Sequence, residues 1–124
     1  MLRSSFVGLL AASALIAQSP LTTTFANNNA GSVGGAVYFD LGVTASAITI
    51  TSIDLNLAGT GSVDIYTTPG TRVGQLTTPG AWTLVASGPV TGATAGTPAP
   101  IQLPPFTLAN GTYGIAILTN GVSH

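Results

Sequence analysis

Few side chains in this 124-residue chain could transfer a proton or attack a substrate. The chain contains 2 Lys+Arg, 3 Asp+Glu and 1 His, and it has no Cys. The acidic residues are Asp40, Asp54 and Asp64, and the histidine is the last residue, His124. A Ser-His-Asp triad would need His124, a terminal residue of the kind that usually frays. We therefore expect no enzyme, and rank a hydrolase third among the possible functions.

Asp54 and Asp64 are the only carboxylates that the sequence predicts to be close together. A hairpin over residues 53–67, turning at Gly59-Thr60-Gly61, would pair Leu55 with Ile65 and place every apolar side chain on one face. The two carboxylates would then lie diagonally, roughly 7–8 Å apart. That separation suits an inverting glycosidase, but nothing apolar nearby would raise either pKa as a general acid requires. The pair is not expected to be catalytic.

The same predicted hairpin gathers Asp54, Asn56 and Asp64 as a possible calcium cluster. Calcium takes six to eight oxygen ligands, usually from a loop that wraps the ion. A pleated strand face offers about three. We interpret these residues as a solvated strand face and expect no metal or other cofactor.

Three aromatic residues, Tyr38, Tyr66 and Trp82, could form a platform for a sugar. Trp82 alternates with Leu84 and Ala86, so the pattern favours a place in the core. Tyr66 is predicted on the outer face and is the best single candidate for ligand contact. A carbohydrate-binding module is accordingly the alternative function.

The charge of the chain excludes two classes of partner. Charged residues make up 4% of the sequence, against about 25% in ordinary soluble proteins. Without a basic patch, neither binding to nucleic acid phosphates nor a polybasic membrane anchor is expected. Surface polysaccharide or other surface proteins are the expected partners.

The N-terminus has the pattern of a secretory signal. Arg3 precedes an apolar run over residues 6–16, which is too short to span a bilayer. We assign residues 1–19 to the signal peptide and 20–124 to one domain, with no membrane span after cleavage. The chain is then exported to the periplasm, the cell surface or the extracellular space.

The short β-prone segments separated by turn residues predict an all-β domain, a small antiparallel sandwich of jelly-roll or immunoglobulin-like type. Strands are expected at 36–41, 47–57, 63–67, 81–87 and 113–119, with a long irregular loop at 91–100. A change of phase in the second strand predicts a β-bulge near Thr51-Ser52. Pro104-Pro105 indicates an edge strand or a broken strand, and residues 108–113 resemble a tyrosine corner.

Residues 113–119 are apolar on both faces, as expected for a strand buried on both sides. The following Asn120-Gly121 is typical of a turn towards another strand. From this pattern we expect the domain to be incomplete at its C-terminus, a fragment able to self-associate through the C-terminal strand.

Several segments together resemble a known group of proteins. They are similar to exported β-sandwich domains of unknown function from planctomycete-type and related Gram-negative bacteria. The segments are TTTFANNNAGSVGGAVYFDLGV, ITITSIDLNL, VDIYTTPGTRVG, AWTLVASG and LANGTYGIAILTN. The resemblance covers residues 22–124 and implies an extracellular or surface-associated role, without functional residues to carry over. It also implies that the chain continues through further strands. The leading expectation is a non-enzymatic, structural or adhesive β-sandwich at the cell surface or in the matrix.

We predict that an exporting host cleaves the chain between residues 14 and 26, because Arg3 and the apolar run form a signal peptide. Intact-mass spectrometry of the secreted protein measures the cleavage site. A soluble protein of full-length mass would contradict the assignment.

Overall fold

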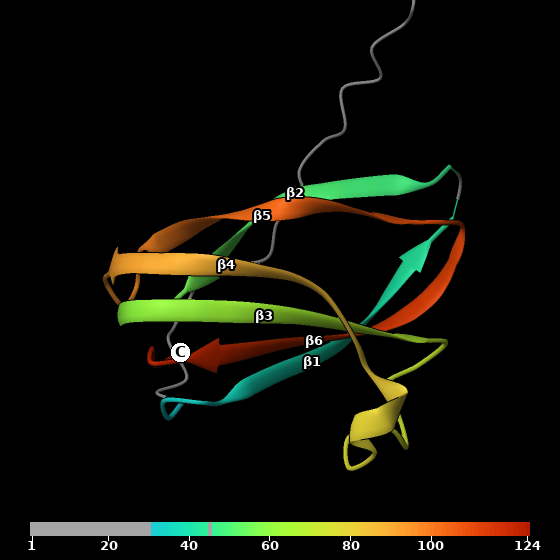
Figure 1. Ribbon diagram of the computed structural model, residues 1–124, viewed down its shortest axis with the longest axis horizontal. Helices are drawn as coiled ribbons and strands as arrows, with labels where there is room; N and C mark the ends of the chain where they lie inside the picture. Colours follow the sequence, from blue (N-terminus) through green and yellow to red (C-terminus); the bar gives the residue numbers. More distant parts are fainter. Residues whose placement is uncertain (1–30, 45) are drawn as a thin grey trace, which may run out of the picture.

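The computed structural model describes residues 31–44 and 46–124 as a β domain. The expected signal peptide and its cleavage region lie outside these residues. These residues form six strands and one short 3-10 turn, Pro79–Ala81, which lies between the third and fourth strands (Figure 1). The strands are β1 Ala36–Val43, β2 Ile48–Asn56, β3 Gly59–Pro69, β4 Thr83–Ala93, β5 Pro98–Leu108 and β6 Gly111–Asn120.

The strands form two antiparallel sheets of unequal size. The larger sheet has four strands in the order β1-β6-β3-β4, and the smaller sheet pairs β2 with β5. Strands β4 and β5 are also in contact, which closes the sandwich on one side. The all-β antiparallel architecture predicted from the sequence is confirmed.

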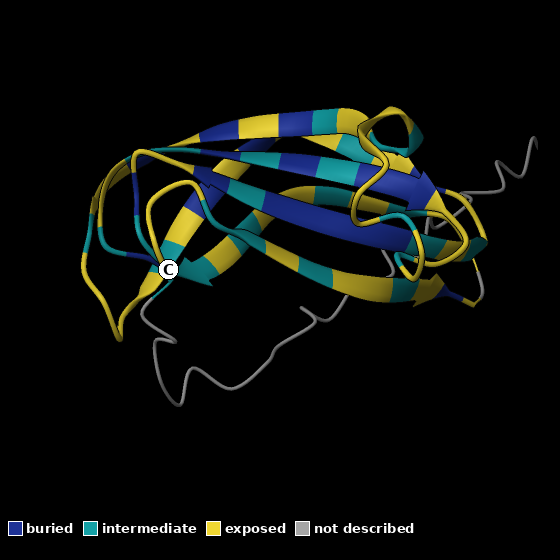
Figure 2. Cartoon of the chain, turned by 90° about the horizontal axis from the view of Figure 1, so that it is seen from below, coloured by how far each residue is buried: buried dark blue, intermediate teal, exposed yellow. Residues whose placement is uncertain are grey.

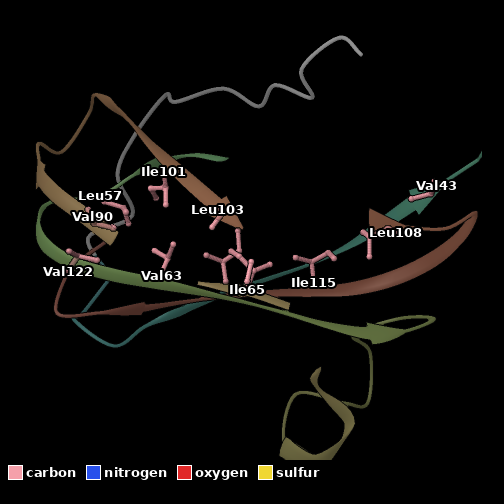
Figure 3. Packing of buried hydrophobic residues seen from close by; sticks show 12 residues of the cluster. Val43, Leu57, Val63, Ile65, Val90, Ile101, Leu103, Leu108, Ile115 and Val122 are labelled. Carbon is pink, nitrogen blue, oxygen red and sulfur yellow. The ribbon is translucent and has the colours of Figure 1, made fainter. Parts of the chain in front are cut away.

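A hydrophobic core lies between the two sheets, where both contribute alternate side chains (Figure 3). Its buried members include Val43, Leu57, Val63, Ile65, Val90, Ile101, Leu103, Leu108, Ile115, Ile117 and Val122. The domain has no cysteine, so burial of these aliphatic side chains is the main stabilising term.

Three local predictions are confirmed. The register of β2 against β5 shifts between Ile50 and Ser52, where the alternation of apolar residues changes phase. The Tyr113 hydroxyl donates a hydrogen bond to the Ala109 carbonyl at 3.2 Å, as in a tyrosine corner. Strand β5, which contains Pro104-Pro105, lies in a two-stranded sheet and is therefore an edge strand, as its prolines indicated.

The predicted hairpin over residues 53–67 is wrong. Leu55 pairs with Ala99 in the smaller sheet, whereas Ile65 pairs with Ala86 and Ile117 in the larger one. The chain changes sheet at Ala58-Gly59, where Gly59 has a φ of 107° that favours glycine. Both side chains still face the core, so the alternation was correctly assigned and the pairing partner was not.

Two further expectations need correction. Residues 91–100 are not a long loop, because β4 extends to Ala93 and β5 begins at Pro98. Trp82 and Leu84 do not face inward with Ala86. The register of β3 against β4 shifts, so that Ile65 pairs with Ala86 but the next residue, Tyr66, pairs with Leu84. The extra residue places Leu84, which is 51% exposed, on the outer face while Ala86 stays buried.

The C-terminal strand β6 lies inside the larger sheet, between β1 and β3. Its residues 114–117 are all buried, as the two apolar faces predicted, and Figure 2 shows this strand as the most continuous buried stretch. Both of its edges are paired, so the unpaired edges of the domain belong to other strands. After β6, Val122 enters the core and Ser123 pairs with Ala58. In the described part of the chain, no helix has the length and apolar character needed to span a membrane.

We predict that Tyr113→Phe lowers the free energy of unfolding by about 1 kcal/mol, because it removes the hydrogen bond to Ala109. Tyr66→Phe is the matched control, since no hydrogen bond of the Tyr66 hydroxyl to a described residue is present. Denaturant unfolding of the three proteins measures the difference. Equal losses in both variants would mean that the corner does not stabilise the fold.

Candidate functional site

Three aromatic residues that the sequence singled out lie together on the outer face of the larger sheet. Tyr38 of β1, Tyr66 of β3 and Trp82, just before β4, line an open hollow of about 270 Å³. Ala116 and Leu118 of β6 form part of its floor, and Leu76 and Pro79 part of its wall. The rings of Tyr38 and Trp82 are tilted by 59° with centroids 5.6 Å apart, an attractive edge-to-face geometry.

The segment that connects β3 to β4, residues 70–82, carries one wall of the hollow. It folds into successive tight turns, in which the backbone N–H groups of Gln75, Thr78 and Ala81 each donate to the carbonyl three residues earlier. The Trp82 indole N–H donates to the Gln75 carbonyl at 2.9 Å. This bond fixes the ring and leaves the Tyr38 and Tyr66 hydroxyls as the side-chain polar groups of the hollow.

Asp40 fastens this connection to the edge strand β1. Its carboxylate accepts hydrogen bonds from the Thr71 hydroxyl and the Arg72 backbone N–H, each at 2.8 Å. Chiefly the Arg72 backbone bond, then the Thr71 bond, holds the pKa of Asp40 below its ordinary value of 3.8. The carboxylate therefore has a structural partner and is not shaped for proton transfer.

Gly114 of β6 is the residue over which the connection crosses. A Cβ at this position would lie 2.7 Å from the Arg72 backbone nitrogen and 2.7 Å from the Thr68 methyl group. Only glycine lets the backbone of residues 70–82 approach the sheet this closely. The wall of the hollow thus depends on a missing side chain as well as on the Asp40 bonds.

The proposed acidic cluster is not assembled. Asp54 and Asn56 lie on β2 in the smaller sheet, whereas Asp64 lies on β3 in the larger sheet. Asp64 accepts hydrogen bonds from the Ser87 hydroxyl and, at 2.9 Å, from the Asn120 amide, and Asn56 accepts from Gly96. Within the described part of the chain, no three His, Asp or Glu residues gather around a possible metal position. The cluster depended on the hairpin register that the structure corrects.

A larger cavity, of about 420 Å³, lies along the connection from β4 to β5 and the adjoining ends of both strands. Proline, threonine, glycine and small aliphatic residues line it, with no aromatic or titratable side chain among them. It therefore offers a ligand little beyond shape, and the aromatic hollow is the stronger candidate site.

The sequence identified the three aromatic residues but not their arrangement. It placed Trp82 in the core, because the bulge that reverses the faces of β4 leaves no mark in the apolar pattern. Leu76 and Pro79 were missed altogether, since they lie in a segment without periodicity. The sequence has a Pro-Gly pair at each end of this segment, Pro69-Gly70 and Pro79-Gly80, and these pairs were the available signal that it folds back.

No family model matches the chain, and a search of curated proteins finds no match.

We predict that acid releases the segment 70–82 from β1. A carboxyl group with a lowered pKa stabilises the folded arrangement above its ordinary pKa, and this contribution disappears as the pH falls through the lowered value. Trp82 is the only tryptophan, so its fluorescence should shift to the red below about pH 4. Asp40→Asn should remove this transition, whereas Asp54→Asn should retain it. An unchanged transition in Asp40→Asn would contradict the assignment.

Proposed function

We propose that the chain is a non-enzymatic exported β-sandwich with a structural or adhesive role at the cell surface or in the extracellular matrix. The proposal rests on the roles of the three aspartate side chains in the fold. Asp40 and Asp64 hold other segments through hydrogen bonds, and Asp54 is exposed on the other sheet. Neither of the two hollows described above is lined by a carboxylate or a histidine, as general acid–base chemistry would require.

The aromatic hollow favours a second, more specific candidate, a carbohydrate-binding module. A pyranose ring presents an apolar face of C–H groups and a rim of hydroxyls. The rings of Tyr66 and Tyr38 offer apolar surface with a hydroxyl at one end, and Leu76 and Pro79 add an apolar wall. Because the hollow is open and lacks charge, a neutral polysaccharide is the ligand that it suits best.

The two candidates are compatible. An adhesive domain needs a surface ligand, and a neutral glycan would not depend on the few charges that this chain carries. The hollow also lies on the face of the larger sheet that is turned away from the core, so a long polysaccharide could approach it without opening the fold.

We expect the mature domain to be retained on insoluble neutral polysaccharides, and Tyr66→Ala to weaken retention about tenfold, equivalent to about 1.4 kcal/mol. Leu84→Ala is the matched control, because Leu84 is an exposed apolar residue on the same outer face but outside the hollow. Depletion assays on cellulose, chitin and a β-1,3-glucan measure the binding, and released reducing ends are assayed in parallel.

The outcomes separate the candidates. Retention that Tyr66→Ala and Leu84→Ala reduce equally would contradict a sugar site in the hollow. Absence of retention on every polysaccharide would remove the carbohydrate-binding candidate and leave the structural role. Release of reducing ends by the wild type would contradict the non-enzymatic assignment itself.

A further inference from the structure

Three of the four edge strands carry features that block pairing with another strand. β4 contains Pro89, β5 contains four prolines, and the pairing of β2 with β5 is interrupted by a register shift between Ile50 and Ser52. Prolines lack the N–H that a ladder needs, and bulges twist an edge away from a straight partner. These three edges are protected by their sequence.

β1 is the exception. It is eight residues long, AVYFDLGV, and pairs with β6 from Ala36 to Val43 without a shift of register. It contains no proline and no lysine, and among the described residues its other edge has no strand partner. A long, regular and apolar edge of this kind is a template for a further strand.

The inner face of β1 is also incompletely covered. Val37 and Phe39 pair with the buried residues Ile117 and Ile115, so they point towards the space between the sheets. Yet they remain 42% and 38% exposed, because the smaller sheet has only two strands and is joined to the larger one on the β4 side. Apolar side chains at the edge of the core therefore face solvent.

We propose that β1 pairs antiparallel with β1 of a second copy of this chain, across a two-fold axis, to form a continuous eight-stranded sheet. Antiparallel self-pairing brings inner-face residues opposite inner-face residues, so Val37 and Phe39 of one copy would lie against inner-face residues of the other. The one charge on β1, Asp40, lies on the outer face and already binds Thr71 and Arg72. The net charge is -1 for the whole chain and -1 - 1 = -2 once Arg3 leaves with the signal peptide, so two copies repel each other little.

This inference does not rest on the sugar site, and it is tested without a sugar. Sedimentation equilibrium of the mature domain should give twice the monomer mass at high micromolar concentration. Val37→Lys places a charge on the inner face of the edge and should shift the mass to that of the monomer. Leu84→Lys introduces the same charge at a more exposed position on the opposite edge strand, β4, and should remain dimeric.

Hydrogen exchange keeps the test independent of whether Val37→Lys folds. In the wild type, protection of peptides from residues 36–43 should rise with protein concentration, while that of β4 peptides should not. A monomeric wild type would overturn the proposal, as would a dimer that Val37→Lys leaves intact. Strong protection of β1 at every concentration would also overturn it, because another segment of the same chain would then cover the edge.

Discussion

The close contact between β4 and β5 at Gly88 determines how the two sheets meet. A Cβ at Gly88 would lie 2.5 Å from a methyl group of Ile101 and 2.7 Å from the Gln102 carbonyl oxygen, so only glycine allows this approach. The contact brings the two-stranded sheet over the β4 side of the four-stranded sheet. With only β2 beyond β5, the smaller sheet ends before it covers the first half of β1. The buried core and the exposed Val37 and Phe39 are therefore two results of one packing contact.

The hollow on the opposite face depends on the same kind of close approach. At Gly114 the missing side chain lets residues 70–82 cross the sheet, and Asp40 then holds them by two hydrogen bonds. Trp82 reaches Tyr38 only because the bulge in β4 turns its end of the strand outward. In a chain with so few charges, backbone approach and single hydrogen bonds replace the ion-pair networks that position loops elsewhere.

Much of the fold could be predicted from the sequence because period-two alternation is a local property. It correctly placed most strands and the register shift near Ser52, and the local pattern of residues 108–113 indicated the tyrosine corner at Tyr113. Strand pairing is not local: the Gly59-Thr60-Gly61 segment suggested a hairpin, but the chain changes sheet there. The possible cluster of Asp54, Asn56 and Asp64 depended on that hairpin and is therefore absent. The outward orientation of Tyr66 was predicted correctly, because it holds under either pairing. The position of Trp82 was not, because it depends on a bulge with no sequence signature.

The position of β1 links the two surfaces of the domain. Alternate residues of this one strand serve different roles: Tyr38 lines the hollow on the outer face, and Val37 and Phe39 lie at the open margin of the core. A two-fold axis perpendicular to the sheet would leave the outer faces of both copies on the same side. Two hollows would then face one surface, and a polysaccharide with repeated units could occupy both. Binding at two linked sites strengthens retention without any new contact within a site, which would add to the adhesion proposed for this domain.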